Sequence, residues 1–507
     1  MQNRKIVLIM TDTQRADMVS CYGNSGMRTP NLDRLAAEGA RFNKAYTCQP
    51  VCGPARAALF TGTWPHINNG WANSMAPDIK TRNVGQRAKE LGLHTAYIGK
   101  WHLDGGDYFG KGKCPPEWDS HYWYEMKNYL DELSSEERVA SREEQTMYQG
   151  DGISEDFTFG HRVANRAVDF LNQHGDEDFL LVASFDEPHG PFLCPPKYLQ
   201  MHKDTTLPWK RNMEDSLQNK PEHQQVWAGD SLQADRSILD LNYQSFFACN
   251  SFVDTEIGRV LDAIDQHAPD ALVIYLSDHG DMCESHRITN KGPVMYDEIT
   301  RIPFIVRWPK VIPEGSVSDN LVSHIDVVNT ILDAAGCEEM PKPLQGKSMV
   351  PMFADLSKPT NDAIFMEFGR YEIDHDGFGG FGGFQPIRCV RNDRYKLTIN
   401  LLCTDELYDM DEDPEELNNL IESDAHHAIR NELHDRLIEW MNTSRDPFRG
   451  YYWQRRPWRS DAPAASWDFT GFTRQREPDT GEATQLDYDT GLTMTQAIRS
   501  KIVPDYA

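Results

Sequence analysis

Two aspartates stand where two separate strands are expected to end. Asp12 follows the apolar run KIVLIMT, and Asp278 with His279 follows the run ALVIYLS. Runs of this kind are typical of strands that are buried on both faces of a sheet. Carboxylates that separate strands bring to one edge can hold a hard divalent cation such as Ca²⁺ or Mg²⁺. The sequence therefore predicts a metal site at Asp12, Asp278 and His279.

The cysteine of the stretch VCGPARAALFTG stands at the predicted start of a helix. Pro54 suits a first helical turn, and the amides of residues 55–57 are then expected to be open toward the helix mouth. An anion there would be stabilised by those amides, by the helix dipole and by Arg56. From these residues alone, three roles stay open for Cys52: a nucleophile, a metal ligand or a packing residue.

The elements that must position these residues follow from an alternation of strand and helix patterns. Helical segments end at glycines such as Gly92 and Gly175. The pattern predicts a large, mostly parallel sheet with helices on both faces, and ligands of such sheets bind at the carboxyl ends of the strands. The strand patterns are residues 5–12, 94–102, 178–189, 271–281 and 302–309.

The pattern of alternating strands and helices changes after about residue 360. We expect a catalytic α/β domain over residues 1–360 and a small subdomain over residues 361–445, with an antiparallel sheet and one helix. Residues 446–507 are rich in arginine and aromatic side chains at their start. They are expected to form a tail that packs on the body.

Composition excludes several partners. The net charge of -27 argues against electrostatic binding of nucleic acid or an anionic membrane, although a locally cationic pocket can still take an anionic substrate. The apolar run at residues 6–10 is too short for a signal peptide or a membrane span, and the ten cysteines show no pairing pattern. We therefore expect a cytoplasmic protein with reduced thiols; a trimmed leader would instead imply a periplasmic or secreted one.

The sequence resembles the type I sulfatases of the alkaline phosphatase superfamily. Their signature is a Cys or Ser, any residue, Pro, any residue and Arg, followed by a segment that ends in Thr-Gly; here it reads CGPAR and AALFTG. The resemblance extends over nearly the whole chain, through TDTQRAD, GKWHL, DEPHGPF, SDHGD and KGPVMYDEITRIPFIVRWP. It is strongest to a bacterial branch of mostly uncharacterised members. It implies an alkaline phosphatase-like α/β fold and hydrolysis of a sulfate ester.

In that family a maturation enzyme, a transient partner, oxidises the cysteine to Cα-formylglycine. The resemblance implies that the hydrate of residue 52 attacks the sulfate and that its second hydroxyl later expels it. It also implies a divalent metal, usually Ca²⁺ with Mg²⁺ as the alternative, held by Asp12, residue 52, Asp278 and His279. Thr13 stands where many members have a second carboxylate or amide. His279 stands where many have asparagine, a variant also found in sulfatases of 2-sulfated uronic acids.

The same match implies roles for five further residues. Arg56 and Lys100 match the cations that hold the hydrated side chain, and His102 matches the base that collapses the sulfate adduct. His189 and Lys291 match groups that bind the sulfate and protonate the leaving alcohol.

We expect the substrate to be a small sulfated saccharide. A glycosaminoglycan-type oligosaccharide is our first hypothesis, with a uronate 2-O-sulfate as one form of it. The stretch EFGRYEIDHDGF mixes charged and aromatic side chains, so Arg370 and His375 are candidates for substrate contacts.

Three other interpretations stay open. The same fold and metal suit a phosphonate monoester or phosphodiester hydrolase. An unmodified Cys52 would fit a glycan-binding protein without turnover. A thiol enzyme or zinc site on Cys48 and Cys52 would need Cys48 for activity. No oligomeric state is predicted.

Overall fold

The computed structural model of the chain describes residues 4–461 except residues 74, 106–108, 209, 234–242, 373–382 and 460. The chain divides into two compact units, Met1–His434 and Asp435–Ala507. Among the described residues, no helix has both the length and the apolar character that a membrane span requires. All ten cysteines are described and carry free thiols.

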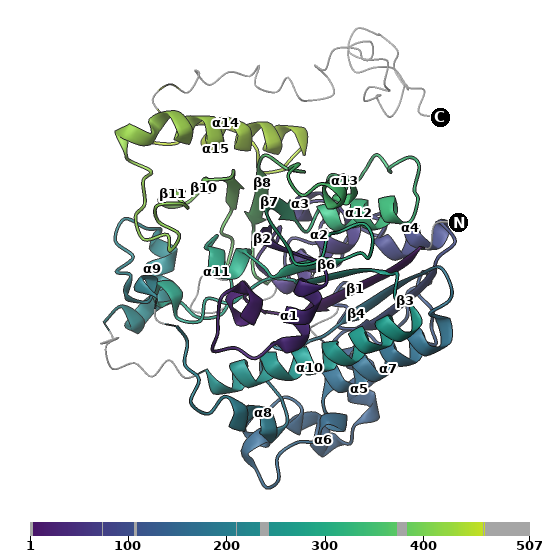
Figure 1. The fold of residues 1–507 in the computed structure, drawn as a ribbon. Helices are drawn as coiled ribbons and strands as arrows, with labels where there is room; N and C mark the ends of the chain where they lie inside the picture. The colour runs from purple at the N-terminus through teal and green to yellow at the C-terminus, as the bar shows by residue number, and fades with distance from the viewer. Residues whose placement is uncertain are drawn as a thin grey trace, which may run out of the picture. The chain divides into compact units, whose positions relative to one another are not determined.

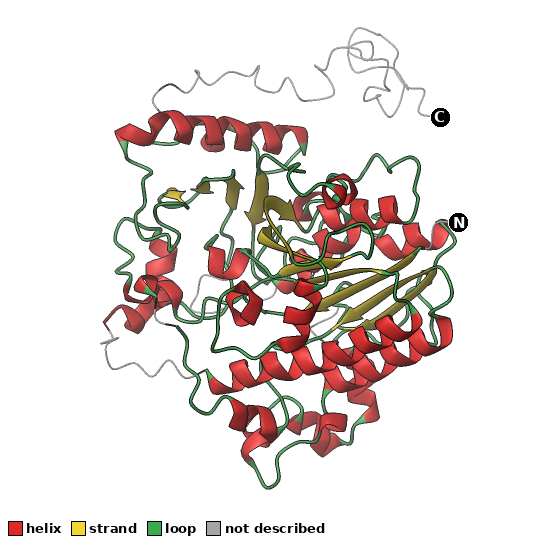
Figure 2. Ribbon diagram, viewed as in Figure 1, coloured by secondary structure: helices red, strands yellow, loops and turns green. Residues whose placement is uncertain are grey.

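A seven-stranded sheet forms the centre of the first unit (Figures 1 and 2). Its strand order is β3-β4-β1-β5-β6-β2-β7, and neighbouring strands are parallel except for the two pairs that β6 makes. The predicted, mostly parallel sheet is thus confirmed. The strands are β1 (Lys5–Thr11), β2 (Ala40–Tyr46), β3 (His94–Gly99), β4 (Phe179–Ser184), β5 (Leu272–Ser277), β6 (Phe304–Arg307) and β7 (Ser316–Ser323).

Alternate side chains of the central strands enter two apolar cores, one on each face of the sheet. On β1, Ile6, Leu8 and Met10 pack into one core, while Val7 and Ile9 pack into the other. Because both faces are covered, the central strands are apolar along their whole length, as their sequence pattern predicted. The first core is shared with α2 (Cys52–Thr61), α4 (Val84–Glu90), α12 (Asp326–Ala334) and α13 (Val350–Ala354), and the second with α1 (Pro30–Ala37), α5 (Met126–Glu132), α7 (Phe159–His174) and α10 (Gln244–His267) (Figure 1).

Local signals set the ends of the long helices. The Thr158 hydroxyl caps α7 by accepting the His161 amide at 3.3 Å, and the helix stops before Gly175 as predicted. Helix α4 begins at a capping box and is followed by Gly92, whose φ of 83° favours glycine. The remaining helices are α3 (Pro65–Asn68), α6 (Ser135–Ala140), α8 (Pro196–Met201), α9 (Glu222–Ala228), α11 (Asp297–Thr300), α14 (His427–Thr443) and α15 (Tyr451–Gln454).

A second, four-stranded sheet follows the large one in sequence. It is antiparallel, with the order β11-β10-β9-β8, which confirms the predicted small antiparallel sheet. Its strands are β8 (Ile364–Phe368), β9 (Ile387–Arg391), β10 (Tyr395–Asn400) and β11 (Glu406–Asp409). Side chains of β8 and β9 share a core with Tyr46 and Val51, which lie just before α2. The boundaries near residues 360 and 445 and the packing of the tail stay predictions, because most of residues 446–507 lie outside the described part.

Candidate active site

The two predicted aspartates lie side by side at the carboxyl edge of the large sheet. Strands β1 and β5 pair in parallel, with Thr11 opposite Ser277, and the next residues are Asp12 and Asp278. Both side chains are fully buried. The strand ends therefore bring two carboxylates together, as the sequence predicted.

The neighbouring strands β3 and β4 bring the cations and histidines to the same edge. Gly99 pairs with Ser184, so Lys100 and the loop that holds Asp186 and His189 emerge next to each other. The Lys100 ammonium lies 2.8 Å from Asp12 Oδ2 and 3.0 Å from Asp186 Oδ1. Asp186 was not predicted, although it follows a strand end in the same way as Asp12.

Helix α2 carries Cys52 as its first residue, and all ten of its residues are buried. The Gly53 amide donates to Asn73 Oδ1 at 2.9 Å, and a Cβ on Gly53 would lie 2.8 Å from the Asn73 carbonyl oxygen. Only glycine fits this approach. The helix begins at Cys52, as predicted, but the prediction that the amides after Pro54 are open was wrong, because the Ala55 amide already donates to the carbonyl of Val51, the residue before the helix.

The Cys52 thiol lies at the centre of the cluster. Lys291 Nζ donates to Cys52 Sγ at 2.7 Å, His279 Nε2 lies 3.1 Å from it and Asp12 Oδ1 lies 3.5 Å from it. Burial raises the pKa of the thiol, but Lys291 and Lys100 outweigh burial and hold it well below its usual value. A side chain at this position is thus presented as an anion.

Arg56 bridges the two aspartates. Its Nη2 lies 3.0 Å from Asp12 Oδ2 and its Nε 3.1 Å from Asp278 Oδ2. Its Nη1 donates to the Lys100 carbonyl at 2.8 Å and to the Ser184 hydroxyl at 2.9 Å. Arg56 therefore orients the carboxylates, whereas Lys291 and His279 contact the Cys52 sulfur.

The donor set fits a divalent metal ion. One ligand atom from each of four residues lies within 4.8 Å of the others; these residues are Asp12, Cys52, Asp278 and His279. His279 Nδ1 donates to the Gly280 carbonyl at 2.7 Å, which leaves Nε2 available toward the cluster. Burial and Asp12 raise the pKa of Asp278 to about 7, so the cluster is short of positive charge despite Arg56. A bound cation would supply it.

The two predicted proton-transfer histidines lie at the ends of β3 and β4. His102 is buried, and burial lowers its pKa below the usual value, which favours the neutral, proton-accepting ring. His189 is half-buried, and its Nδ1 donates to the Gly190 carbonyl at 2.8 Å. The charge of His189 lowers the pKa of Asp12, which places this histidine within electrostatic reach of the metal ligands.

The substrate contacts expected at Arg370 and His375 stay predictions. Arg370 is half-buried and follows β8 by two residues. Its neighbour Tyr371, which sequence reasoning missed, accepts the Asn73 amide at 2.9 Å through its carbonyl and so ties the segment after β8 to the start of α2. His375 lies outside the described residues. His66, on α3, hydrogen-bonds the Glu367 carboxylate of β8.

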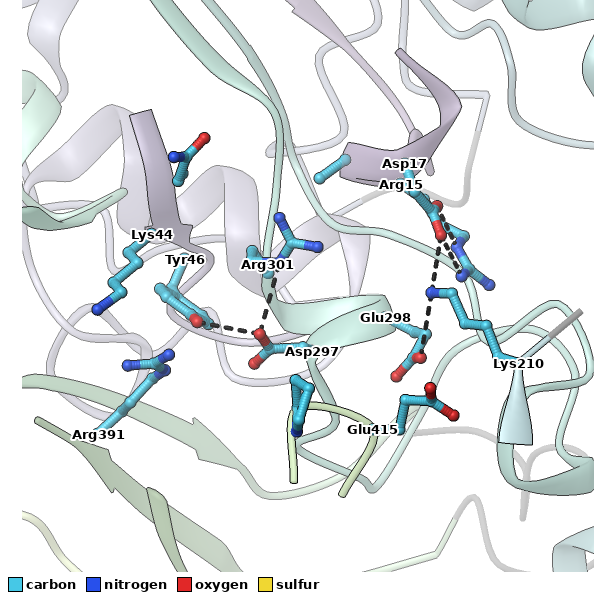
Figure 3. Close-up of a pocket in the computed structure, with 13 residues that line it drawn as sticks. Arg15, Asp17, Lys44, Tyr46, Lys210, Asp297, Glu298, Arg301, Arg391 and Glu415 are labelled. Atoms are coloured by element: carbon cyan, nitrogen blue, oxygen red, sulfur yellow. Dashed lines mark hydrogen bonds and ion pairs between the residues drawn. The ribbon is translucent and has the colours of Figure 1, made fainter. Parts of the chain in front are cut away.

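A separate polar pocket also gathers buried charges (Figure 3). This cavity of about 250 Å³ has Asp297 near its centre, which accepts a hydrogen bond from the Tyr46 hydroxyl at 3.1 Å and lies 3.4 Å from Arg301 Nε. The fully buried Lys396 lies 2.8 Å from the same carboxylate. No sequence motif predicted this pocket. Its lining residues are Arg15, Ala16, Asp17, Asn43, Lys44, Tyr46, Lys210, Asp297, Glu298, Arg301, Arg391, Pro414 and Glu415.

Comparison with known proteins assigns the chain to a family. Residues 4–337 match the family model described as Sulfatase, and residues 285–443 match the one described as N-sulphoglucosamine sulphohydrolase, C-terminal. The chain belongs to the sulfatase family. This sulfatase is therefore a hydrolase of sulfate esters, as the resemblance predicted.

Individual relatives support the assignment. The uncharacterized sulfatase YidJ of Escherichia coli (strain K12) is 45% identical over 507 residues, which cover 98% of each protein. The N-acetylglucosamine-6-O-sulfatase of Bacteroides thetaiotaomicron is 25% identical, over 87% of each protein. A solved structure, described as a complex with its substrate D-glucosamine-2-N,6-O-disulfate, matches with a TM-score of 0.72 and 22% identity over 88% of this sulfatase and 99% of that chain. This last likeness shows the fold.

Proposed function

We propose that this sulfatase removes a sulfate ester from a sugar of a glycosaminoglycan-type oligosaccharide. The observation that carries the proposal is the contact of Cys52 Sγ with Lys291 and His279 beside the paired carboxylates. The N-acetylglucosamine-6-O-sulfatase relative supports a sulfated sugar. His279 extends the proposal to 2-O-sulfated uronates, because the sequence resembles sulfatases of that type at this position.

We propose that Cys52 acts after conversion to formylglycine, so that its thiol stands in for the hydrated side chain. The hydrate supplies a nucleophilic oxygen and a second hydroxyl through which sulfate can be expelled. Lys291 and Lys100 hold negative charge at this position, as they do for the thiol. Asp12, Asp278 and His279 would hold a divalent ion, Ca²⁺ in this proposal, whose chemistry is to polarise the sulfate oxygens.

The surrounding histidines divide the proton transfers. When the bond from sulfur to the sugar oxygen breaks, that oxygen takes a proton from His189 Nε2. His102, which burial keeps neutral, then accepts the proton of the second hydroxyl as sulfate leaves. Lys291 and Lys100 stabilise the charge that develops on the sulfate oxygens.

A substrate screen tests the proposed activity. Defined sulfated mono- and disaccharides would be incubated with the mature enzyme, and released sulfate measured by ion chromatography. Phosphonate monoesters and phosphodiesters would be assayed in parallel. We expect turnover of at least one sulfated sugar; a preference of about a hundredfold for a phosphonate or phosphodiester would contradict the proposal.

Peptide mass spectrometry tests the proposed modification. Conversion to the aldehyde lowers the mass of the peptide that contains residue 52 by about 18 Da. Only unmodified thiol in active enzyme would contradict the mechanism. Unmodified thiol in a protein that binds glycans without turnover would instead support a binding function.

A further inference from the structure

A second group of metal-ligating side chains lies at the opposite end of the strands from the catalytic cluster. His94 is the first residue of β3, His174 is the last residue of α7, and Glu177 stands in the turn that leads to β4. Strand β3 runs from this group toward Lys100, which separates the two sites by about 20 Å of extended chain. The group is therefore independent of the proposed sulfate chemistry.

The three side chains present their ligand atoms to one point. His94 Nδ1 lies 3.0 Å from Glu177 Oε2, and His174 Nδ1 lies 2.8 Å from Glu177 Oε1. One ligand atom from each residue lies within 4.8 Å of the other two. Neighbouring ligand atoms around a tetrahedral zinc ion are about 3.3 Å apart, given its bond lengths to nitrogen and oxygen. Small movements would open the present contacts to that spacing.

The far nitrogen of each imidazole already has the partner that a metal-bound histidine needs. His94 Nε2 lies 2.8 Å from Asp119 Oδ2, and His174 Nε2 lies 3.1 Å from the Tyr122 hydroxyl. Histidines that bind a metal through one ring nitrogen usually donate the proton of the other to such a group. Without a cation, both Nδ1 atoms donate to the Glu177 carboxylate. When a cation takes the place of those protons, Asp119 and the Tyr122 hydroxyl can accept the Nε2 protons, and both Nδ1 atoms then offer a lone pair.

Aromatic packing fixes the two rings in place. The centroid of the Phe170 ring lies 5.2 Å from that of His94 and 5.1 Å from that of His174, and Tyr122 packs edge-on against both. The two imidazoles cross at 82° with centroids 4.5 Å apart. The side chains of His94 and His174 are 22% and 23% exposed, so an ion can reach a preorganised site from solvent.

We propose that His94, His174 and Glu177 form a second metal site, which binds Zn²⁺ with water as the fourth ligand. Two imidazoles and one carboxylate suit zinc, whereas calcium takes sets of oxygen ligands. Binding releases to solvent the protons that the two Nδ1 atoms donate to Glu177, and each ring keeps one proton on Nε2, which it donates to Asp119 or to the Tyr122 hydroxyl. The ion then joins the end of α7 to the starts of β3 and β4, which stabilises the folded state in proportion to zinc occupancy.

Zinc binding to the full-length mature enzyme tests this proposal. The probe is ZnCl₂ alone, added by equilibrium dialysis. Excess Ca²⁺ is present so that the catalytic cluster is occupied. Bound zinc per protein chain is measured by inductively coupled plasma mass spectrometry. We expect one zinc ion in the wild type and, in crystals, an anomalous peak between His94, His174 and Glu177. The melting temperature should rise with zinc concentration.

Variants separate this site from the catalytic one. We expect His94→Gln with His174→Gln to weaken zinc binding at least about a hundredfold, and Asp119→Asn about tenfold, with sulfate release unchanged in both. His161→Gln, on the same helix, is the matched control: His161 Nδ1 lies 2.9 Å from Glu256 and 3.2 Å from the cationic Arg259, and its loss should leave zinc binding unchanged.

Three results would overturn the site: wild type without zinc, equal zinc affinity in the double variant, or an anomalous peak only at the catalytic cluster. If the double variant does not fold, Glu177→Gln replaces it, because that side chain is 51% exposed.

Discussion

The catalytic cluster and the pocket of Figure 3 both contain buried carboxylates beside cations, but the pKa values of Asp278 in the cluster and Glu298 in the pocket shift in opposite directions. In the pocket, burial opposes ionisation of Glu298, but Lys210 and His286 lower its pKa to about 2. In the cluster, burial and Asp12 raise the pKa of Asp278 to about 7 although Arg56 is 3.1 Å away. The cations of the pocket therefore outweigh the burial of Glu298, whereas in the cluster the cations outweigh burial for Asp12 but not for Asp278.

The direction of the pKa shift distinguishes buried carboxylates that stabilise the fold from those that serve a functional site. A buried carboxylate whose cations outweigh its desolvation stabilises the fold. A buried carboxylate that stays uncompensated lowers the stability of the fold and has affinity for a further cation.

Loss of the residue at the centre of the cluster should have the largest effect. Cys52→Ala removes the only side chain of α2 that contacts both Lys291 and His279 among the described residues, and we expect kcat to fall by roughly 10⁴-fold or more. Cys48→Ala is the matched control, because the Cys48 thiol lies 3.5 Å from the Ser323 hydroxyl and outside the cluster. Equal losses in the two variants would favour a thiol or zinc site on both cysteines.

Neutralising one carboxylate in each region should give crossed effects. Asp278→Asn should lower kcat by about 10²-fold or more while the free energy of unfolding in EDTA stays unchanged or rises. Asp297→Asn should leave kcat unchanged but lower the free energy of unfolding by about 3 kcal/mol, because the buried Lys396 loses a partner. Urea denaturation and initial rates measure both. If both variants lost a similar amount of unfolding free energy, the proposed difference between the carboxylates of the cluster and those of the pocket would be wrong.

The pH dependence of stability tests whether the pocket holds Glu298 as a carboxylate. Because the pKa of Glu298 is lowered from its usual value to about 2, its contribution is present above the unfolded pKa and is lost as pH falls toward about 2. The shift corresponds to about 3 kcal/mol at neutral pH. The difference in unfolding free energy between wild type and Glu298→Gln should therefore shrink steadily below about pH 4.5. A constant difference would show that Glu298 titrates normally.

The smallest effect is expected at Thr13, which joins the two metal-ligand strands. Its φ of 68° is strained for a β-branched residue, and its hydroxyl donates to Asp12 Oδ1 at 2.7 Å. Thr13→Asn should relieve the backbone strain and raise the free energy of unfolding by up to about 1 kcal/mol. It should change kcat/KM by less than about tenfold. Thr13→Val keeps the strain but loses the hydroxyl. It should therefore reduce activity more than Thr13→Asn does.

The parts of the site that follow strand ends could be predicted from the sequence. Asp12, Lys100 and Asp278 each come directly after a buried strand, with His279 next to Asp278, and parallel pairing brings such positions together. Asp186 carries the same signal and could have been found. The direction of β6 could not, because an apolar run is the same in a parallel or an antiparallel strand.

Contacts between distant segments also lay beyond the sequence. The bridge that Arg56 makes between Asp12 and Asp278 was not predicted, because it depends on how α2 lies against the ends of β1 and β5. The role of Arg56 in holding the hydrated residue 52 stays a prediction. The pairing of His66 with Glu367 depends on how the second sheet meets α3, which no local pattern encodes. The pocket of Figure 3 likewise draws its residues from segments that are far apart in sequence.

The complete burial of α2 has a consequence for the order of events during synthesis. Once this helix is covered, another enzyme has no path to the sulfur of Cys52, which is only 1% exposed. The proposed conversion must therefore happen on the emerging or unfolded chain, before the sheet closes over it. Fast folding would then compete with maturation, and a chain that folded too early would be trapped as a stable but inactive protein.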